Sequence, residues 1–150
     1  MERVALKGQN LIIYTDGVSR GNPGDAGIGV VLKDKNGAVV DEIGKYIGTT
    51  TNNVAEYTAL INALEYAVKH KTVSADIFLD SELVVRQMNG VYRVKDENLA
   101  LLFNKAQALI KKIRVKGQGS RVTLTHIPRE KNKEADNLAN KAVDLHLSKK

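Results

Sequence analysis

Cysteine and tryptophan are both absent from this sequence of 150 residues, and proline occurs only twice. The lack of cysteine excludes disulfides, thiolate zinc sites and cysteine nucleophiles. No apolar run reaches the roughly 18 to 20 residues that span a membrane, and the first ten residues lack the apolar segment of a secretory signal. We therefore expect a single soluble domain over residues 1–150, with its core at about 11–147, located in the cytoplasm and away from membranes.

Positive charge is present in excess, and it is unevenly spread along the chain. The formal net charge is +6, and 43% of the residues are hydrophobic, which is enough for a sizeable core. Residues 1–85 hold 8 basic and 11 acidic residues, a net of −3, whereas residues 86–150 hold 15 and 6, a net of +9. The basic half favours a polyanionic partner, first of all nucleic acid. Ordinary solubilising charge remains the alternative.

Apolar periodicity predicts nine secondary-structure elements. Strands are expected where β-formers run between turn signals, and helices where apolar residues recur every three or four positions. The expected strands are 11–16, 27–32, 38–47, 77–80 and 121–127, with a glycine-rich turn at 17–24 and a linker at 116–120. The expected helices are about 53–70, 81–88, 97–113 and about 132–147.

The order βββαβααβα indicates an α/β fold with a five-stranded mixed sheet flanked by helices. The first three strands have short connections and form an antiparallel meander, while the helical crossovers make the later strands parallel to their neighbours. Sites in such sheets lie at the C-terminal ends of the parallel strands. Asp16 and Asp80 both follow an apolar strand at that position.

Four acidic residues interrupt apolar surfaces, and each also has a structural explanation. Asp16 could initiate a turn, and Asp80 could cap a helix. Glu56 stands three residues after Asn53 with the spacing of a capping box, yet it lies on the apolar stripe of its helix. Asp136 likewise falls on the apolar face of the last helix. Isolated buried acids are costly, but acids that converge around a cation are not.

The chemistry of such a cluster would follow from its oxygen ligands. Asp16, Glu56, Asp80 and Asp136 would supply carboxylates with no histidine or thiolate, which suits Mg²⁺ or Mn²⁺ and argues against zinc. Two such ions about 3.5 to 4 Å apart activate water and stabilise the leaving oxygen in phosphodiester cleavage. Spacing alone does not establish that the four acids meet.

Several short motifs occur in an order that is specific when they are taken together. They are YTDG at 14–17, GNPG at 21–24, TNNVAE at 51–56, DS at 80–81 and NKEAD at 132–136. The chain resembles type 1 ribonuclease H in these motifs, from about residue 11 to residue 143, in the short form without a basic protrusion. The resemblance implies a ribonuclease H-like fold, and the element order derived above agrees with it.

The resemblance also implies an activity and a set of roles. The family cleaves the RNA strand of RNA–DNA hybrids by a two-metal-ion mechanism, leaving 5′-phosphate and 3′-hydroxyl ends. Asp16 would bridge both Mg²⁺ ions, with Mn²⁺ as a possible substitute. Glu56 and Asp80 would complete the site that holds the attacking water, and Glu56 could accept a hydrogen bond from a ribose 2′-hydroxyl. Asp136 would serve the second ion.

The same resemblance assigns residues that bind substrate. Asn22, Asn52 and Asn53 match positions that read minor-groove edges and sugars, and Thr51 matches part of a pocket for a DNA-strand phosphate. Gly17 is expected in the same substrate-binding set. Minor-groove edges are similar in all sequences, so recognition would be largely independent of sequence. Turn and cap chemistry is the alternative for the asparagines.

Three departures from the family pattern change the expectations. Without the tryptophan-rich basic handle, binding of the hybrid would rely on other cations, for which the candidates are Arg86, Arg93, Lys95, Lys111, Lys112 and Arg114. Glu82 stands where many relatives have glutamine, and it would either weaken binding slightly or help to position water. The loop before the last acid lacks the family's histidine.

Arg129 is the candidate in that loop for contact with the scissile phosphate, because its guanidinium is always charged and binds phosphate oxygens in a forked geometry. A solvated surface charge is the alternative for Arg129. His126 is expected to be a packed or edge histidine of the last strand, and a shuttle role in product release is the alternative.

Two other functions remain open on the sequence. One is a different nuclease activity on the same fold, such as cleavage of double-stranded RNA, since fold alone does not fix function. The other is a non-catalytic module that binds nucleic acid, although this would be expected to lack one of the carboxylates. We expect a free-standing monomer that acts on RNA–DNA hybrids.

Overall fold

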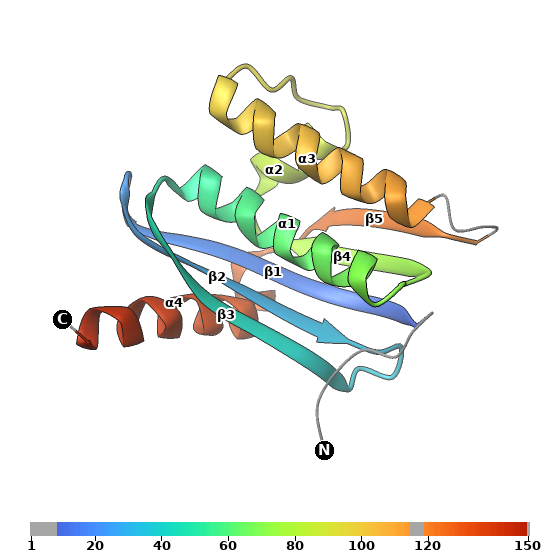
Figure 1. The fold of residues 1–150 in the computed structure, drawn as a ribbon, viewed down its shortest axis with the longest axis horizontal. Coiled ribbons are helices and arrows are strands. Elements are labelled where there is room, and N and C mark those ends of the chain that lie inside the picture. Colours follow the sequence, from blue (N-terminus) through green and yellow to red (C-terminus); the bar gives the residue numbers. More distant parts are fainter. Residues whose placement is uncertain (1–8, 115–118, 150) are drawn as a thin grey trace.

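A mixed sheet of five strands lies at the centre of the computed structural model, which describes residues 9–114 and 119–149 (Figure 1). The strands are β1 (Asn10–Gly21), β2 (Gly24–Lys33), β3 (Val39–Thr50), β4 (Ser74–Leu79) and β5 (Arg121–His126). The helices are α1 (Asn52–Lys69), α2 (Glu82–Met88), α3 (Glu97–Arg114) and α4 (Lys133–Ser148), with a 3₁₀ turn at Arg129–Lys131.

The strand order β3-β2-β1-β4-β5 confirms the predicted mixed sheet. β1 pairs antiparallel with β2, and β2 with β3, whereas β4 runs parallel to both β1 and β5. The predicted order of strands and helices is also correct. Most of the expected linker at 116–120 lies outside the described residues, so its structure is not tested.

The glycine-rich segment after Asp16 differs from the prediction of a turn over 17–24. β1 continues to Gly21 and pairs residue by residue with β2 as far as Gly21 opposite Gly24. The ladder of backbone hydrogen bonds keeps these residues extended, because glycine lacks only the side chain and not the backbone groups that pair. Only Asn22 and Pro23 remain as the connection, and Asp16 therefore lies inside a strand.

The helices cover the two faces of the sheet unequally. Figure 1 shows α1 and α3 on one face and α4 on the other. The main core lies under α1, where Ile13, Leu60, Leu64 and Ile77 are fully buried. None of the helices in the described ranges is both long and apolar enough to cross a membrane.

The backbone of helix α4 lies very close to two glycines of β2. A Cβ placed on Gly29 of β2 would lie 1.9 Å from the backbone oxygen of Ala135, and one placed on Gly27 would lie 2.6 Å from the oxygen of Ala139. Both distances are far below van der Waals contact, so only glycine fits at these two positions. The backbone of α4 is consequently held directly against β2.

The structural alternatives for Glu56 and Asp80, a capping box and a helix cap, do not hold. Thr51, rather than Asn53, is the N-cap of α1, and its hydroxyl accepts a hydrogen bond from the Val54 N–H. Ser81, rather than Asp80, caps α2 by accepting from the Val84 N–H. A hydroxyl satisfies the unpaired N–H groups of a helix start as well as a carboxylate does. The carboxylates of Glu56 and Asp80 are therefore not needed as caps.

Candidate active site

Two neighbouring parallel strands bring Asp16 and Asp80 together. The register of β1 and β4 pairs Thr15 with Leu79, so the next residue of each strand lies at the same level of the sheet. Alternate residues of a strand point to opposite faces, and Asp16 is paired with Gly29, whose missing side chain would point at α4. The two carboxylates therefore face the side of the sheet that α4 covers.

Glu56 joins them because α1 begins directly on top of Gly17. A Cβ on Gly17 would lie only 2.2 Å from the backbone carbon of Ala55 and 2.4 Å from the Glu56 nitrogen. The Gly17 N–H donates to Glu56 Oε1 at 2.8 Å. Asp16, Glu56 and Asp80 each offer a carboxylate oxygen, and these oxygens lie within 4.8 Å of one another.

Burial and mutual repulsion raise the pKa values of this three-acid cluster. The side chains of Asp16 and Glu56 are almost fully buried. Burial raises the pKa of Asp16 most, followed by the charges of Glu56 and Asp80 and by a hydrogen bond with Asp136. Burial and the charge of Asp80 raise the pKa of Glu56, and the Gly17 N–H partly offsets them.

Among the described residues, the three acids have no partner in an ion pair. None of the ion pairs among residues 9–114 and 119–149 includes Asp16, Glu56 or Asp80. Buried carboxylates that lack a cation repel one another, and a divalent ion held by their oxygens would remove that repulsion. The donor set, all oxygen and closely spaced, fits a hard cation such as Mg²⁺ or Mn²⁺.

Asp136 lies beside the cluster, but it does not belong to the three closely spaced acids. It stands in the first turn of α4 and is half-buried. Its carboxyl group reaches Asp16, whose pKa it raises by a hydrogen bond and by its charge. One of its oxygens, Oδ1, accepts from the side chain of Asn140 at 3.3 Å. The four predicted acids thus converge on one place, with Asp136 on the α4 side.

Asn132 is a residue of the site that the sequence reasoning missed. Its side chain is buried, and its Nδ2 donates to the backbone oxygen of Thr15 at 2.8 Å and to Asp80 Oδ2 at 3.3 Å. It therefore ties the start of α4 to β1 and orients Asp80. An asparagine at a predicted helix start is normally explained as a cap, but Asn132 makes no cap hydrogen bond with its side chain.

The acids line an open cleft of about 330 Å³. Gly17, Asn52, Asn53 and Arg129 line the same cleft. A neighbouring hollow of about 470 Å³ is lined by Asn22 and Thr51 and shares Asn52 and Asn53 with the first. The structure thus brings every sequence-predicted substrate residue to one continuous surface next to the acids.

Two of the asparagines are held in place by their amide oxygens. Asn52 Oδ1 accepts from the Ser19 N–H at 3.0 Å, and Asn22 Oδ1 accepts from the Asn52 N–H at 3.1 Å. Neither amide NH₂ group donates a hydrogen bond within the part of the chain that the structure describes. These bonds join segments 33 and 30 residues apart, so they are not the local turn and cap contacts of the alternative. They leave the two NH₂ groups available as donors.

The histidine and arginine near the last acid have different surroundings. Arg129 opens the 3₁₀ turn before α4 and lines the acidic cleft. His126 is exposed at the end of β5, which is an edge strand, and it does not line the cleft. The prediction of an edge histidine is confirmed.

The basic candidates for binding nucleic acid lie in two separate regions. Lys111, Lys112 and Arg114 are in the last turn of α3, where Arg114 donates to the Val122 oxygen near the start of β5. That is the opposite end of the sheet from the acids, so this candidate group is poorly placed.

The other basic group lies in and just after α2, the helix that begins two residues after Asp80. Arg93 and Lys95 are exposed in the loop after α2. Arg86 stacks over the ring of Tyr92 at 5.4 Å and pairs with Glu82 at 3.7 Å, so Glu82 has a cationic partner on its own helix.

Comparisons with known proteins agree with this architecture. The family model described as "Reverse transcriptase-like" matches residues 14–142. The "Bifunctional protein Rv2228c" of Mycobacterium tuberculosis is 44% identical over 135 residues, which is 89% of this chain and 35% of that protein. The chain therefore spans about a third of the length of this relative.

Two solved structures match this chain over nearly their whole length. The crystal structure of RNase H1 from Halobacterium salinarum has a TM-score of 0.83 at 40% identity and covers 90% of this chain and 98% of that one. LC11-RNase H1, solved in complex with an RNA/DNA hybrid, has a TM-score of 0.82 at 47% identity and covers 91% and 99% of the two chains.

The five-stranded sheet in the order β3-β2-β1-β4-β5, with four helices and an acidic cluster from β1, α1 and the end of β4, defines the ribonuclease H-like class of α/β proteins. Within that class, the family is shown by the family model that matches 129 residues of this chain and by identities of 40% and 47% to the two solved RNase H1 structures. The chain belongs to the type 1 ribonuclease H family.

Proposed function

We propose that this protein is an endoribonuclease that hydrolyses the RNA strand of RNA–DNA hybrids and leaves 5′-phosphate and 3′-hydroxyl ends. The observation that carries the proposal is the convergence of Asp16, Glu56 and Asp80 from β1, α1 and the end of β4 on one open cleft. A relative with 47% identity over 91% of the chain was solved with such a hybrid bound, which supports the choice of substrate.

Two Mg²⁺ ions are the proposed cofactors, with Mn²⁺ as a substitute. Asp16, Glu56 and Asp80 would hold one ion, and Asp16 and Asp136 would hold the other. When bound, such ions lower the pKa of water and offset charge on the leaving oxygen. The chain's own contribution is to keep the carboxylates converged, with Asn132 orienting Asp80 and the Gly17 N–H orienting Glu56.

Minor-groove contact is proposed for the asparagines. The minor groove presents acceptors on every base pair, adenine N3 or thymine O2 and their equivalents, together with ribose hydroxyls. The NH₂ groups of Asn22 and Asn52 are donors that the fold leaves unused, and their amide oxygens are fixed by backbone N–H groups. Asn53 lines the cleft between them and the acids, and Thr51 would contribute to a phosphate pocket in the adjoining hollow.

Arg129 is proposed to contact the scissile phosphate. It lines the cleft that contains all four acids. Arginine does not titrate near neutral pH, so its contribution would be electrostatic stabilisation of charge on the phosphate or easier departure of the product. Gly17 would act through its missing side chain, which lets α1 approach β1.

The decisive experiment is cleavage of a labelled RNA–DNA hybrid beside double-stranded RNA and double-stranded DNA, with Mg²⁺, Mn²⁺ or a chelator. We expect cleavage of the hybrid's RNA strand with either ion and none with the chelator. Faster cleavage of double-stranded RNA would favour the alternative nuclease function. Binding of hybrid without cleavage under both ions would indicate a non-catalytic module. Asp80→Asn serves as the inactive control, and sedimentation of the same sample tests the proposed single-domain monomer.

A further inference from the structure

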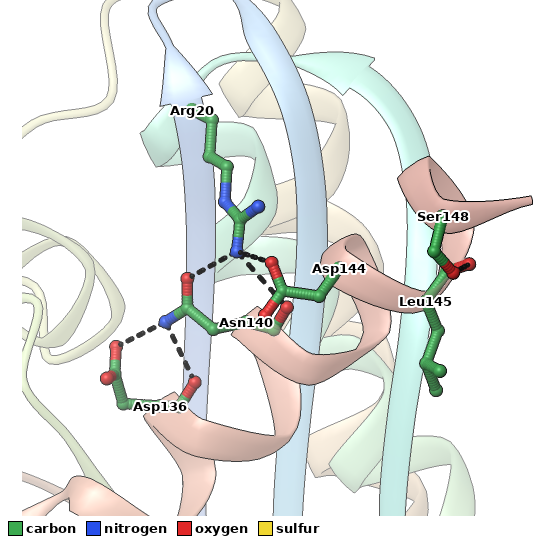
Figure 2. Close-up of polar contacts among 6 residues, drawn as sticks. All are labelled: Arg20, Asp136, Asn140, Asp144, Leu145 and Ser148. Carbon is green, nitrogen blue, oxygen red and sulfur yellow. Dashed lines mark hydrogen bonds and ion pairs between the residues drawn. The ribbon is translucent and has the colours of Figure 1, made fainter. Parts of the chain in front are cut away.

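A line of polar side chains connects the fourth acid to the surface of α4. Asp136, Asn140 and Asp144 stand four residues apart and therefore lie on one stripe of the helix. Arg20 of β1 extends over this stripe, as Figure 2 shows. The guanidinium donates to the Asn140 backbone oxygen at 3.2 Å and to Asn140 Oδ1 at 3.3 Å, and it pairs with Asp144 at 2.7 Å.

Asn140 then contacts Asp136 with the other end of its amide. Its Nδ2 donates to the backbone oxygen of Asp136 at 3.1 Å and to Asp136 Oδ1 at 3.3 Å (Figure 2). Only one carboxylate oxygen is used in this contact. Asp136 also lines the cleft together with Asp16.

The donors and acceptors in this line allow one arrangement only. A guanidinium can only donate, whereas an amide has a donor end and an acceptor end. Arg20 therefore requires the oxygen of Asn140 on its side, which turns the NH₂ group toward Asp136. If Asn140 were reversed, its NH₂ would meet the guanidinium and its oxygen would meet a carboxylate. Asp144 in turn holds Arg20 over the helix.

We propose that Arg20 and Asn140 act as positioning residues for the reaction, with Arg20 fixing the Asn140 amide so that it orients the Asp136 carboxylate toward the cleft. The inference rests on the proposed function for its catalytic consequence. It assigns to Arg20 a role in orienting an acid that Arg20 does not touch. Groups that orient metal ligands typically contribute 10- to 100-fold in metal affinity or activity.

The test compares Asn140→Ala and Arg20→Met with a matched control. Lys33→Met also removes a cation that joins a strand to α4, because Lys33 pairs with Glu134 at 3.0 Å. This ion pair includes none of the four acids of the cleft. Both test variants are expected to lower kcat by about tenfold with KM for the hybrid within about twofold. The control is expected to keep the parent's kcat.

Two further measurements separate positioning from a general loss of structure. Combining Asn140→Ala with Arg20→Met should lower kcat no further than Asn140→Ala alone, because both act through one contact. Arg20→Lys should recover part of the loss, since an ammonium can still donate to Asn140. Calorimetric titration of the substrate-free protein with Mn²⁺ should show weaker binding in both test variants, by about tenfold.

Several results would overturn the proposal. Parent-like kcat and Mn²⁺ affinity in Asn140→Ala would show that Asp136 needs no orientation. A rise in KM and a flatter salt dependence confined to Arg20→Met would show that Arg20 binds a phosphate instead. Equal losses in Lys33→Met would indicate a structural effect. If the parent itself does not cleave hybrid, the proposed function fails, and the Mn²⁺ titration alone then decides whether Arg20 and Asn140 orient Asp136.

Discussion

Replacing Asp16 with asparagine should stabilise the metal-free protein while it abolishes cleavage. The asparagine side chain has nearly the same shape but carries no charge. Asp16 is only 4% exposed and lies among three other acids, and no ion pair within residues 9–114 and 119–149 includes it. Its carboxylate is needed when a metal ion is bound, and it is a source of repulsion when none is bound.

The magnitude follows from the pKa of Asp16. An unfolded chain gives aspartate a pKa of about 3.9, whereas burial and the neighbouring acids raise the pKa of Asp16 in the folded state to about 10. An acid whose pKa is higher in the folded than in the unfolded protein favours folding at pH values below the unfolded pKa. This contribution to the free energy of unfolding is lost as pH rises from the unfolded pKa toward the folded pKa. Between pH 4 and pH 7 the loss is at most about 4 kcal/mol, since each pKa unit corresponds to about 1.4 kcal/mol.

The assay is urea unfolding at several pH values after treatment with a chelator. The parent should lose stability from about pH 4 upward, and Asp16→Asn should lose less, so the gap between them widens with pH. Added Mg²⁺ should stabilise the parent more than the variant, because ligand binding to the folded state adds to its stability.

Asp76→Asn is the matched control, because it should behave in the opposite way. Burial tends to raise the pKa of Asp76, but hydrogen bonds from Thr123 and Arg121 outweigh this and lower it. Asp76 therefore contributes stability at neutral pH that is lost as pH falls, and its replacement should destabilise the protein at pH 7. A destabilised Asp16→Asn, or one with the parent's pH dependence, would refute the idea that the acids repel one another.

Three more predictions follow from the same structure. Gly29→Ala should lower the free energy of unfolding by about 1 to 3 kcal/mol through overpacking against α4. Urea unfolding would measure this beside Gly44→Ala, where an added Cβ would lie 3.2 Å from the Leu138 oxygen and should cost less. Arg129→Ala should lower turnover of hybrid much more than it raises KM, while His126→Ala should have parent kinetics; the reverse pattern would contradict the roles proposed here. Neutralising Arg93 and Lys95 together should flatten the dependence of hybrid affinity on salt by up to about two units of slope, and an unchanged slope would place the basic surface elsewhere.

The order of elements and the position of the acids could be predicted because both are local properties of the sequence. Apolar runs and periodicity mark the strands and helices, and an acid that follows an apolar run, as Asp16 and Asp80 do, is visible without knowledge of neighbours. The convergence of Asp16 and Asp80 follows from the parallel crossover. Their chemistry then follows from residue type.

The parts that could not be predicted depend on contacts between distant segments. Glycines after Asp16 suggested a turn, but pairing with β2 keeps them extended. Asn132 was hidden because its partners, Thr15 and Asp80, are 117 and 52 residues away. The choice of Thr51 over Asn53 as a cap depends on where β3 ends, and propensity does not fix this to within a residue or two.

The direct contact between the α4 backbone and the glycines of β2 determines how the site responds to substitutions in β2. On the α1 face, close backbone contact occurs at the start of the helix, where Ala55 lies over Gly17, and large side chains such as Leu60 and Leu64 are buried farther along. On the α4 face, the helix backbone meets β2 at both Gly27 and Gly29. The separation of Asp136 from Asp16 therefore depends directly on these two glycines, and a side chain added at either one would push the two carboxylates apart.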